Sequence, residues 1–114
     1  MMTALALTML LVLPHRALAH AVLVRSNPAD HATVRAGDTA IELTFNSRID
    51  AARSSVTLLG MDGAPHTLKL DPHAAPNVLA TKASGLVAGE YRLQWQVLAS
   101  DGHISRGVLT FHVT

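Results

Sequence analysis

The stretch YRLQWQV, residues 91–97, decides the fold class because its large apolar side chains alternate with polar ones. Successive side chains of a β-strand point to opposite faces, so a period of two predicts a strand with one face in a core and the other in water. The same pattern occurs at residues 41–45 (IELTF), 56–58 (VTL) and 109–113 (LTFHV). Shorter strands are expected at residues 21–25, 67–70 and 78–81.

Turn signals separate these segments, among them Asn27-Pro28, Asp71-Pro72 and Ala88-Gly89. No part of residues 20–114 keeps a helical period for about ten residues. About seven short strands at this spacing predict an all-β, Greek-key β-sandwich of immunoglobulin-like or cupredoxin-like shape. Trp95 is expected in the packed centre of that sandwich.

Residues 1–19 are predicted to be an export signal that is removed. An apolar run covers residues 4–13, and Ala17-Leu18-Ala19 provides a small-x-small cleavage site, although the first residues carry no Lys or Arg. The run is far shorter than the roughly twenty residues of a membrane-spanning helix, so cleavage is favoured over a retained anchor. We therefore expect one domain, residues 20–114, exported to the periplasm or the cell-surface space.

The composition excludes several kinds of partner and site. Loss of Arg16 with the signal leaves eight basic and eight acidic residues from the nine and eight of the whole chain. A net charge near zero provides no field of one sign for nucleic acid or an anionic membrane. The absence of cysteine excludes disulfides and thiolate metal sites. Met61 is the single methionine of residues 20–114, which disfavours tight Cu(I) binding.

Cleavage after Ala19 would make His20 the first residue, with a free α-amine and an imidazole that can chelate one metal ion. Asp101 and His103 add two further donors, and a spacing of two places both on one face of an extended strand. Nitrogen and oxygen donors suit a tetragonal Cu(II) ion. The sequence predicts one Cu(II) per chain at His20, Asp101 and His103. Asp101 is expected to ligate directly; the alternative is that it orients an imidazole.

The other histidines are weaker candidates. His31 follows a predicted turn near the N-terminal strand and is a possible additional ligand, whereas His66, His73 and His112 are expected on the surface. An isolated Asp-x-His segment is more often an ordinary turn than a metal site, and the carboxylate then accepts backbone hydrogen bonds. The metal prediction therefore depends on His20 and the Asp101–His103 segment occurring together.

Several segments carry a family resemblance: HAVL at residues 20–23, SNPAD at 26–30, IELTF at 41–45, AGEYRLQW at 88–95, and SDGH at 100–103 with Gly107 and Phe111. Together they resemble the CopC-type periplasmic copper-resistance proteins. The resemblance implies a β-sandwich that binds Cu(II) at its N-terminal edge through His20, Asp101 and His103. It implies a carrier or buffer without enzymatic activity, and a CopD-like inner-membrane copper transport protein as partner, here expected to be a separate polypeptide.

The chain departs from that family pattern at two places. Met61 stands alone where the best-known members have a methionine-rich loop that holds Cu(I). Residues 46–48 (NSR) lack the acidic residue that many members place near the metal. We therefore expect a form that binds only Cu(II).

Two other functions remain open from the sequence. Copper polysaccharide monooxygenases also hold their metal with an N-terminal histidine, but present a flat aromatic surface, and this chain has only Phe45, Tyr91, Trp95 and Phe111. A carboxylate ligand would also close the position that O₂ needs. In a non-metal interaction sandwich, His20 and the Asp101–His103 segment would never meet. A metal site requires His20 to lie within a few ångströms of Asp101 and His103, whereas the interaction sandwich does not.

Overall fold

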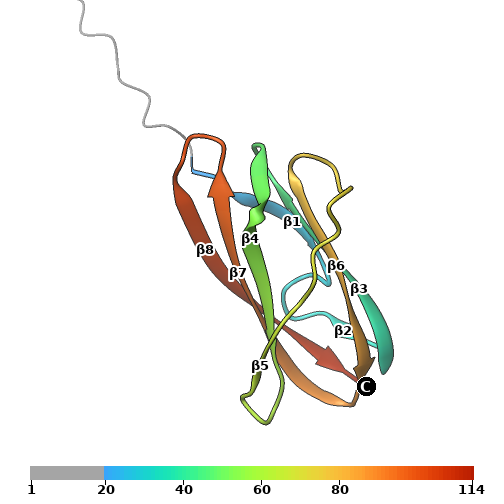
Figure 1. Ribbon diagram of the computed structural model, residues 1–114. Coiled ribbons are helices and arrows are strands. Elements are labelled where there is room, and N and C mark those ends of the chain that lie inside the picture. Colours follow the sequence, from blue (N-terminus) through green and yellow to red (C-terminus); the bar gives the residue numbers. More distant parts are fainter. Residues whose placement is uncertain (1–19) are drawn as a thin grey trace, which may run out of the picture.

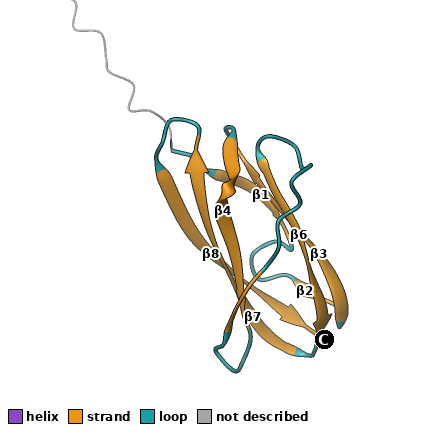
Figure 2. Cartoon of the chain, in the orientation of Figure 1, coloured by secondary structure: helices purple, strands orange, loops and turns teal. Residues whose placement is uncertain are grey.

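The computed structural model describes residues 20–114, so the predicted signal at 1–19 lies outside the described residues. Within them every regular element is a strand, and no helix is long and apolar enough to cross a membrane (Figures 1 and 2). The strands are β1 (Leu23–Asn27), β2 (Thr33–Val34), β3 (Gly37–Phe45), β4 (Ile49–Leu59), β5 (Pro65–Thr67), β6 (Val78–Leu86), β7 (Gly89–Ala99) and β8 (Ile104–Val113).

The strands form two packed sheets, ordered β1-β3-β6 and β2-β8-β7-β4-β5. All neighbours are antiparallel except β2, which runs parallel to the end of β8. The chain crosses between the sheets from β1 to β2, from β2 to β3, from β3 to β4, from β5 to β6 and from β6 to β7 (Figure 1). The predicted all-β sandwich is confirmed. It has eight strands in place of about seven, since the two-residue β2 is too short to show any periodicity.

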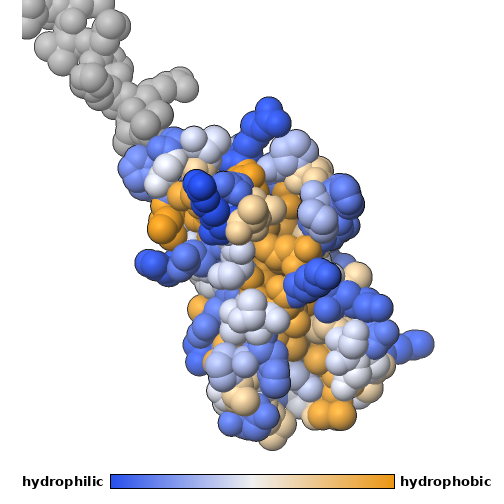
Figure 3. Space-filling view, in the orientation of Figure 1, coloured by the Kyte–Doolittle hydropathy of each residue, from blue (hydrophilic) through white to orange (hydrophobic). Residues whose placement is uncertain are grey.

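The core consists of the alternating apolar residues named by the sequence. Ile41, Leu43 and Phe45 of β3 are at most 1% exposed, and Leu93 and Phe111 of the facing sheet are fully buried. Burying one such side chain stabilises the fold by about 1.5–3 kcal/mol. Figure 3 shows apolar surface along the middle of the visible face, with hydrophilic residues on both sides of it.

Two strand predictions need correction. The strand expected at residues 67–70 is wrong, because β5 covers Pro65–Thr67 and the chain then leaves the ladder. Leu68 and Leu70 are instead partly buried against the core outside any strand. The strand expected at residues 56–58 is only the second half of β4, whose first half shows no alternation.

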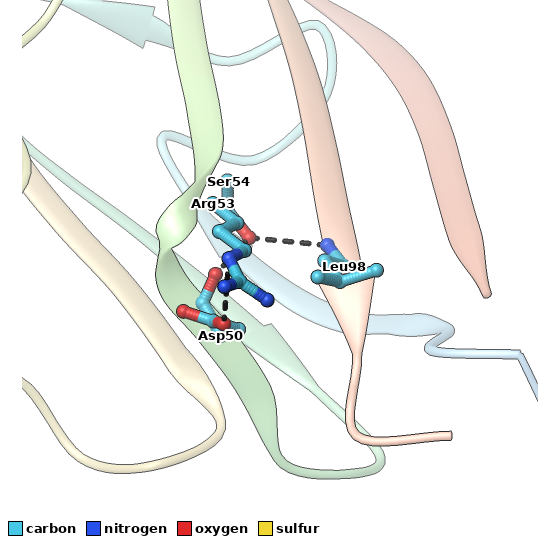
Figure 4. Close-up of polar contacts among 4 residues, drawn as sticks. All are labelled: Asp50, Arg53, Ser54 and Leu98. Atoms are coloured by element: carbon cyan, nitrogen blue, oxygen red, sulfur yellow. Dashed lines mark hydrogen bonds and ion pairs between the residues drawn. The ribbon is translucent and has the colours of Figure 1, made fainter. Parts of the chain in front are cut away.

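A large bulge explains why the first half of β4 lacks a clear pattern. Asp50 pairs with Leu98 and Ser55 with Gln96, so residues 51–54 stand opposite Val97 alone. The Ser54 hydroxyl replaces the missing ladder bonds: it accepts from Leu98 N at 3.1 Å and donates to Asp50 O at 2.6 Å. Arg53 also pairs with Asp50 at 3.9 Å (Figure 4). Bulges of this kind bend the strand and redirect its end.

Trp95 is not in the centre of the sandwich, contrary to expectation. Its side chain is only partly buried, and its ring meets Phe45 edge-on, with centroids 5.2 Å apart. Across the ladder Trp95 pairs with Gly107. Since Gly107 has no side chain, the indole lies against the backbone of β8. The tryptophan therefore lies at the margin of the core, in a surface hollow between residues 20–23 and the start of β8.

Candidate metal centre

The Asp101–His103 segment forms the turn between β7 and β8, and is not the extended strand that the spacing suggested. Gly102 has φ +88°, a left-handed conformation that residues with a Cβ rarely adopt. Ala99 N donates to His103 O at 2.8 Å, which closes the hairpin. His103 N donates to Asp101 Oδ1 at 3.0 Å, an Asx turn. This turn brings Asp101 Oδ2 to 3.1 Å from His103 Nδ1.

His20 lies beside this turn, although it comes from the opposite end of the described chain. Its ring centroid is 4.9 Å from that of His103, and the two rings are nearly perpendicular at 85°. The chain then enters the sandwich at Ala21, which is 3% exposed, and continues into β1. All three predicted site residues are therefore neighbours at one end of the fold.

The three side chains are adjacent, but they do not yet surround a common point. Within residues 20–114, no three His, Asp or Glu side chains are arranged around one metal position. Metal–nitrogen bonds of about 2.0–2.1 Å at right angles would separate neighbouring donors by about 2.9 Å. The 3.1 Å between Asp101 Oδ2 and His103 Nδ1 is close to this value.

The carboxylate of Asp101 has an oxygen that suits a cation. The side chain is only 16% exposed, and among the described residues no group donates a well-aligned hydrogen bond to the buried Oδ2. The other buried oxygen of this kind is Ser47 Oγ. The neighbouring Arg48 O accepts from Ser100 N at 3.2 Å, so the two turns are side by side. Buried polar atoms without partners are costly, and a bound cation would remove this cost for Asp101.

Hydrogen bonds keep Asp101 ionised. The backbone N–H of His103 is the largest cause that lowers the pKa of this carboxyl below its usual value, and burial opposes it. The His103 side chain and the charges of His103 and His20 lower the pKa further. An ionised carboxylate beside two imidazoles is a suitable donor set for a divalent metal ion.

The lowered pKa of Asp101 predicts an acid-dependent loss of stability in the metal-free protein. The ionised carboxylate contributes stability above the usual aspartate pKa of about 3.9, and this contribution is lost as pH falls through the lower folded-state value. Asp101→Asn keeps an acceptor for His103 N but removes the charge. Urea unfolding from pH 6 to 2 should therefore show a shallower acid decline in the variant. Parallel declines would contradict the assignment.

The remaining histidines lie away from this turn. His31 N donates to Thr110 O, which places it at the other end of β8, so it is not a further ligand. His66, His73 and His112 are exposed, as expected. His73 N donates to Asp71 Oδ1 at 2.8 Å, so Asp71-Pro72-His73 is a second Asx turn of the same spacing. The sequence did not identify Asn46 and Ser47 as residues close to this site. It showed only that residues 46–48 lack an acidic residue.

Comparison with known proteins decides the family. Residues 23–114 match the model of the CopC domain. The chain belongs to the CopC family. Copper resistance protein C of Xanthomonas campestris pv. juglandis is 36% identical over 107 residues, which cover 85% of this chain and 82% of that protein. The predicted resemblance is thereby confirmed.

Two solved structures of the family have the same fold as this CopC-family protein. CopC from Methylosinus trichosporium OB3b is 31% identical with a TM-score of 0.74, over 82% of this chain and 93% of that one. PcoC, a methionine-rich copper resistance protein from Escherichia coli, is 31% identical with a TM-score of 0.68, over 84% of this chain and 100% of that one.

Proposed function

We propose that this CopC-family protein is an exported Cu(II) carrier or buffer that binds one Cu(II) per chain through His20, Asp101 and His103. One observation carries the proposal: the ring centroids of His20 and His103 are 4.9 Å apart, and the buried Oδ2 of Asp101 lies beside them. The names of the relatives support copper as the metal, since they are called copper resistance proteins.

The proposed donors are the α-amine and imidazole of His20, an imidazole nitrogen of His103, and Asp101 Oδ2. Removal of residues 1–19 would free the amine, which then forms a chelate ring with the imidazole of the same residue. Three nitrogens and one oxygen match the tetragonal preference of Cu(II). Because the amine and imidazoles must lose protons to bind, affinity should rise with pH.

The position of these donors supports a carrier over an enzyme. His20 is exposed and the His103 side chain is 50% exposed, so a bound ion would be within reach of another protein. Four donors including a carboxylate would fill the positions that an oxidase keeps for O₂. We propose that the protein acts in the periplasm and passes Cu(II) to a CopD-like inner-membrane copper transport protein.

The oxidation state follows from the donor types. Met61 is the single methionine of the described residues, and its side chain is 80% exposed. Cu(I) favours soft thioether and thiolate donors, which the proposed site lacks. We therefore propose that the cargo is Cu(II) alone, in contrast to a relative that is described as methionine-rich.

A Cu(II) titration followed by EPR tests the proposal on the protein that begins at His20. We expect a single tetragonal, nitrogen-rich spectrum that saturates at one Cu(II) per chain. Several weak signals that grow without a break at one equivalent would overturn the proposal. His73→Ala should leave the spectrum unchanged, since that Asx turn has no N-terminal histidine beside it.

Asp101→Asn separates direct ligation from orientation of His103. The amide can still accept the hydrogen bond from His103 N, but is a much poorer copper ligand. Direct ligation predicts altered EPR parameters together with weaker binding. An unchanged spectrum with an affinity loss of about 10- to 100-fold would mean that Asp101 only orients an imidazole.

A further inference from the structure

We propose that Asn46 is a positioning residue that holds the N-terminal arm, residues 20–22, so that His20 faces the Asp101–His103 turn. The proposal rests on the proposed function, because it assigns Asn46 a role in presenting a metal ligand. Asn46 is not itself a donor in the proposed site, and it acts through the backbone of Val22.

Two reciprocal hydrogen bonds connect Asn46 to the arm. Val22 N donates to Asn46 Oδ1 at 2.8 Å, and Asn46 N donates to Val22 O at 3.0 Å. The ladder between β1 and β3 ends one step earlier, at the pair Leu23 and Phe45. Asn46 therefore extends the pairing by one residue, using its side chain at the point where the chain leaves β3.

An amide or carboxylate side chain is required here because the backbone changes direction. After Phe45 the chain turns toward β4, so the side-chain oxygen of Asn46 provides the acceptor for Val22 N. Alanine would leave the Val22 N–H to water. The bond is exposed, so it belongs to the weaker class of hydrogen bonds and its loss should have a measurable but limited effect.

Ala21 also anchors the arm, and its role differs from that of Asn46. Ala21 is 3% exposed and fixes how deeply the arm enters the core. Val22 is 52% exposed and His20 is also exposed, so packing alone does not set the direction of the arm. The hydrogen bonds of Asn46 supply that direction. A preordered arm loses less conformational entropy when the amine and imidazole bind metal.

The test is a double-mutant cycle on four proteins: the chain that begins at His20, its Asn46→Ala variant, and both proteins with one alanine added before His20. Cu(II) affinity is measured by competition with a chelator at fixed pH. In the chain that begins at His20, Asn46→Ala should weaken Cu(II) binding about 3- to 10-fold, which corresponds to the net free energy of one hydrogen bond. In the extended pair, which lacks the free amine, the effect should be less than about 2-fold.

Each outcome decides the proposal. An equal loss of Cu(II) affinity in both pairs would mean that Asn46 acts on general stability. No loss of affinity in either pair would mean that Asn46 does not position the arm. Either result overturns the inference. The proposed function fails separately, when the extension itself leaves the affinity unchanged. Asn77→Ala is the matched control, because the Asn77 side chain donates to Phe45 O at 3.1 Å in the same region without touching the arm.

A second readout needs no copper. Amide hydrogen exchange of Val22 in the metal-free protein should accelerate about 3- to 10-fold in Asn46→Ala, and Asn46→Asp should restore the slow rate because it keeps the acceptor oxygen. Exchange at Val56 in the core should not change. Equal Val22 exchange in all three proteins would overturn the inference independently of any metal measurement.

Discussion

With one alanine added before His20, the protein should lose at least about 100-fold in Cu(II) affinity. This exceeds the loss of about 10- to 100-fold that is typical when a residue that only orients a metal ligand is removed. The extension turns the α-amine into a peptide nitrogen, which no longer binds as a neutral donor, and it breaks the chelate ring. The imidazole of His20 can remain beside His103, so the fold and the ring contact are retained. Chelator competition at pH 7.5 gives the two affinities.

Thermal unfolding of both metal-free proteins provides the control for this result. Equal midpoints with a large difference in affinity would locate the effect at the amine. Equal affinities would show that the amine is not a ligand, and the alternative of a non-metal interaction sandwich would then be favoured. His103→Ala in the unextended protein should produce a loss of similar size, because it removes the imidazole that His20 faces.

The second large effect is expected from Gly107→Ala, which should destabilise the protein by about 1–3 kcal/mol through overpacking. A Cβ at this position would lie 2.3 Å from Trp95 Cζ2 and 2.5 Å from Cε2. The indole also meets the fully buried Phe45 edge-on, so it cannot move toward that ring without a second clash. Urea unfolding measures the loss, and the emission of Trp95, the single tryptophan of the chain, should shift as the ring moves.

A smaller ring at position 95 tests whether the clash is the cause. Trp95→Phe should itself be destabilising, but combined with Gly107→Ala the total should be less than the sum of the two single effects. The shortfall should be at least about 0.5 kcal/mol, as is usual for residues in contact. Strict additivity would mean that contact with the indole is not the cause of the Gly107→Ala effect.

Most of the fold was predictable because one local property determines it. Alternation over residues 41–45, 91–97 and 109–113 specifies strands with one buried face, and these residues form the core of both sheets. The first half of β4 was missed because four bulged residues interrupt the period of two. The two-residue β2 was missed because its pairing with β8 comes from tertiary contact and not from local pattern.

The position of Trp95 marks where such reasoning fails. Trp95 has the spacing of a core residue in β7, and its ring does lie on the inward face of the sheet. Its place at the margin of the core depends on Gly107 of the adjacent strand, which the spacing of β7 alone cannot predict. Which residues stand opposite one another is a property of strand register.

The sequence by itself determined the donor types of the proposed site: a histidine after a predicted cleavage site, an Asp-Gly-His segment, no thiolate, and one methionine within residues 20–114. These are local chemical properties, so they can be recognised without coordinates. Only the tertiary structure decided which Asp-x-His turn has a partner, because Asp71-Pro72-His73 forms the same local hydrogen bond as Asp101-Gly102-His103. Pairing of β1 with β3, continued by Asn46, carries His20 to the β7–β8 turn, and contact between distant segments depends on sheet register and packing.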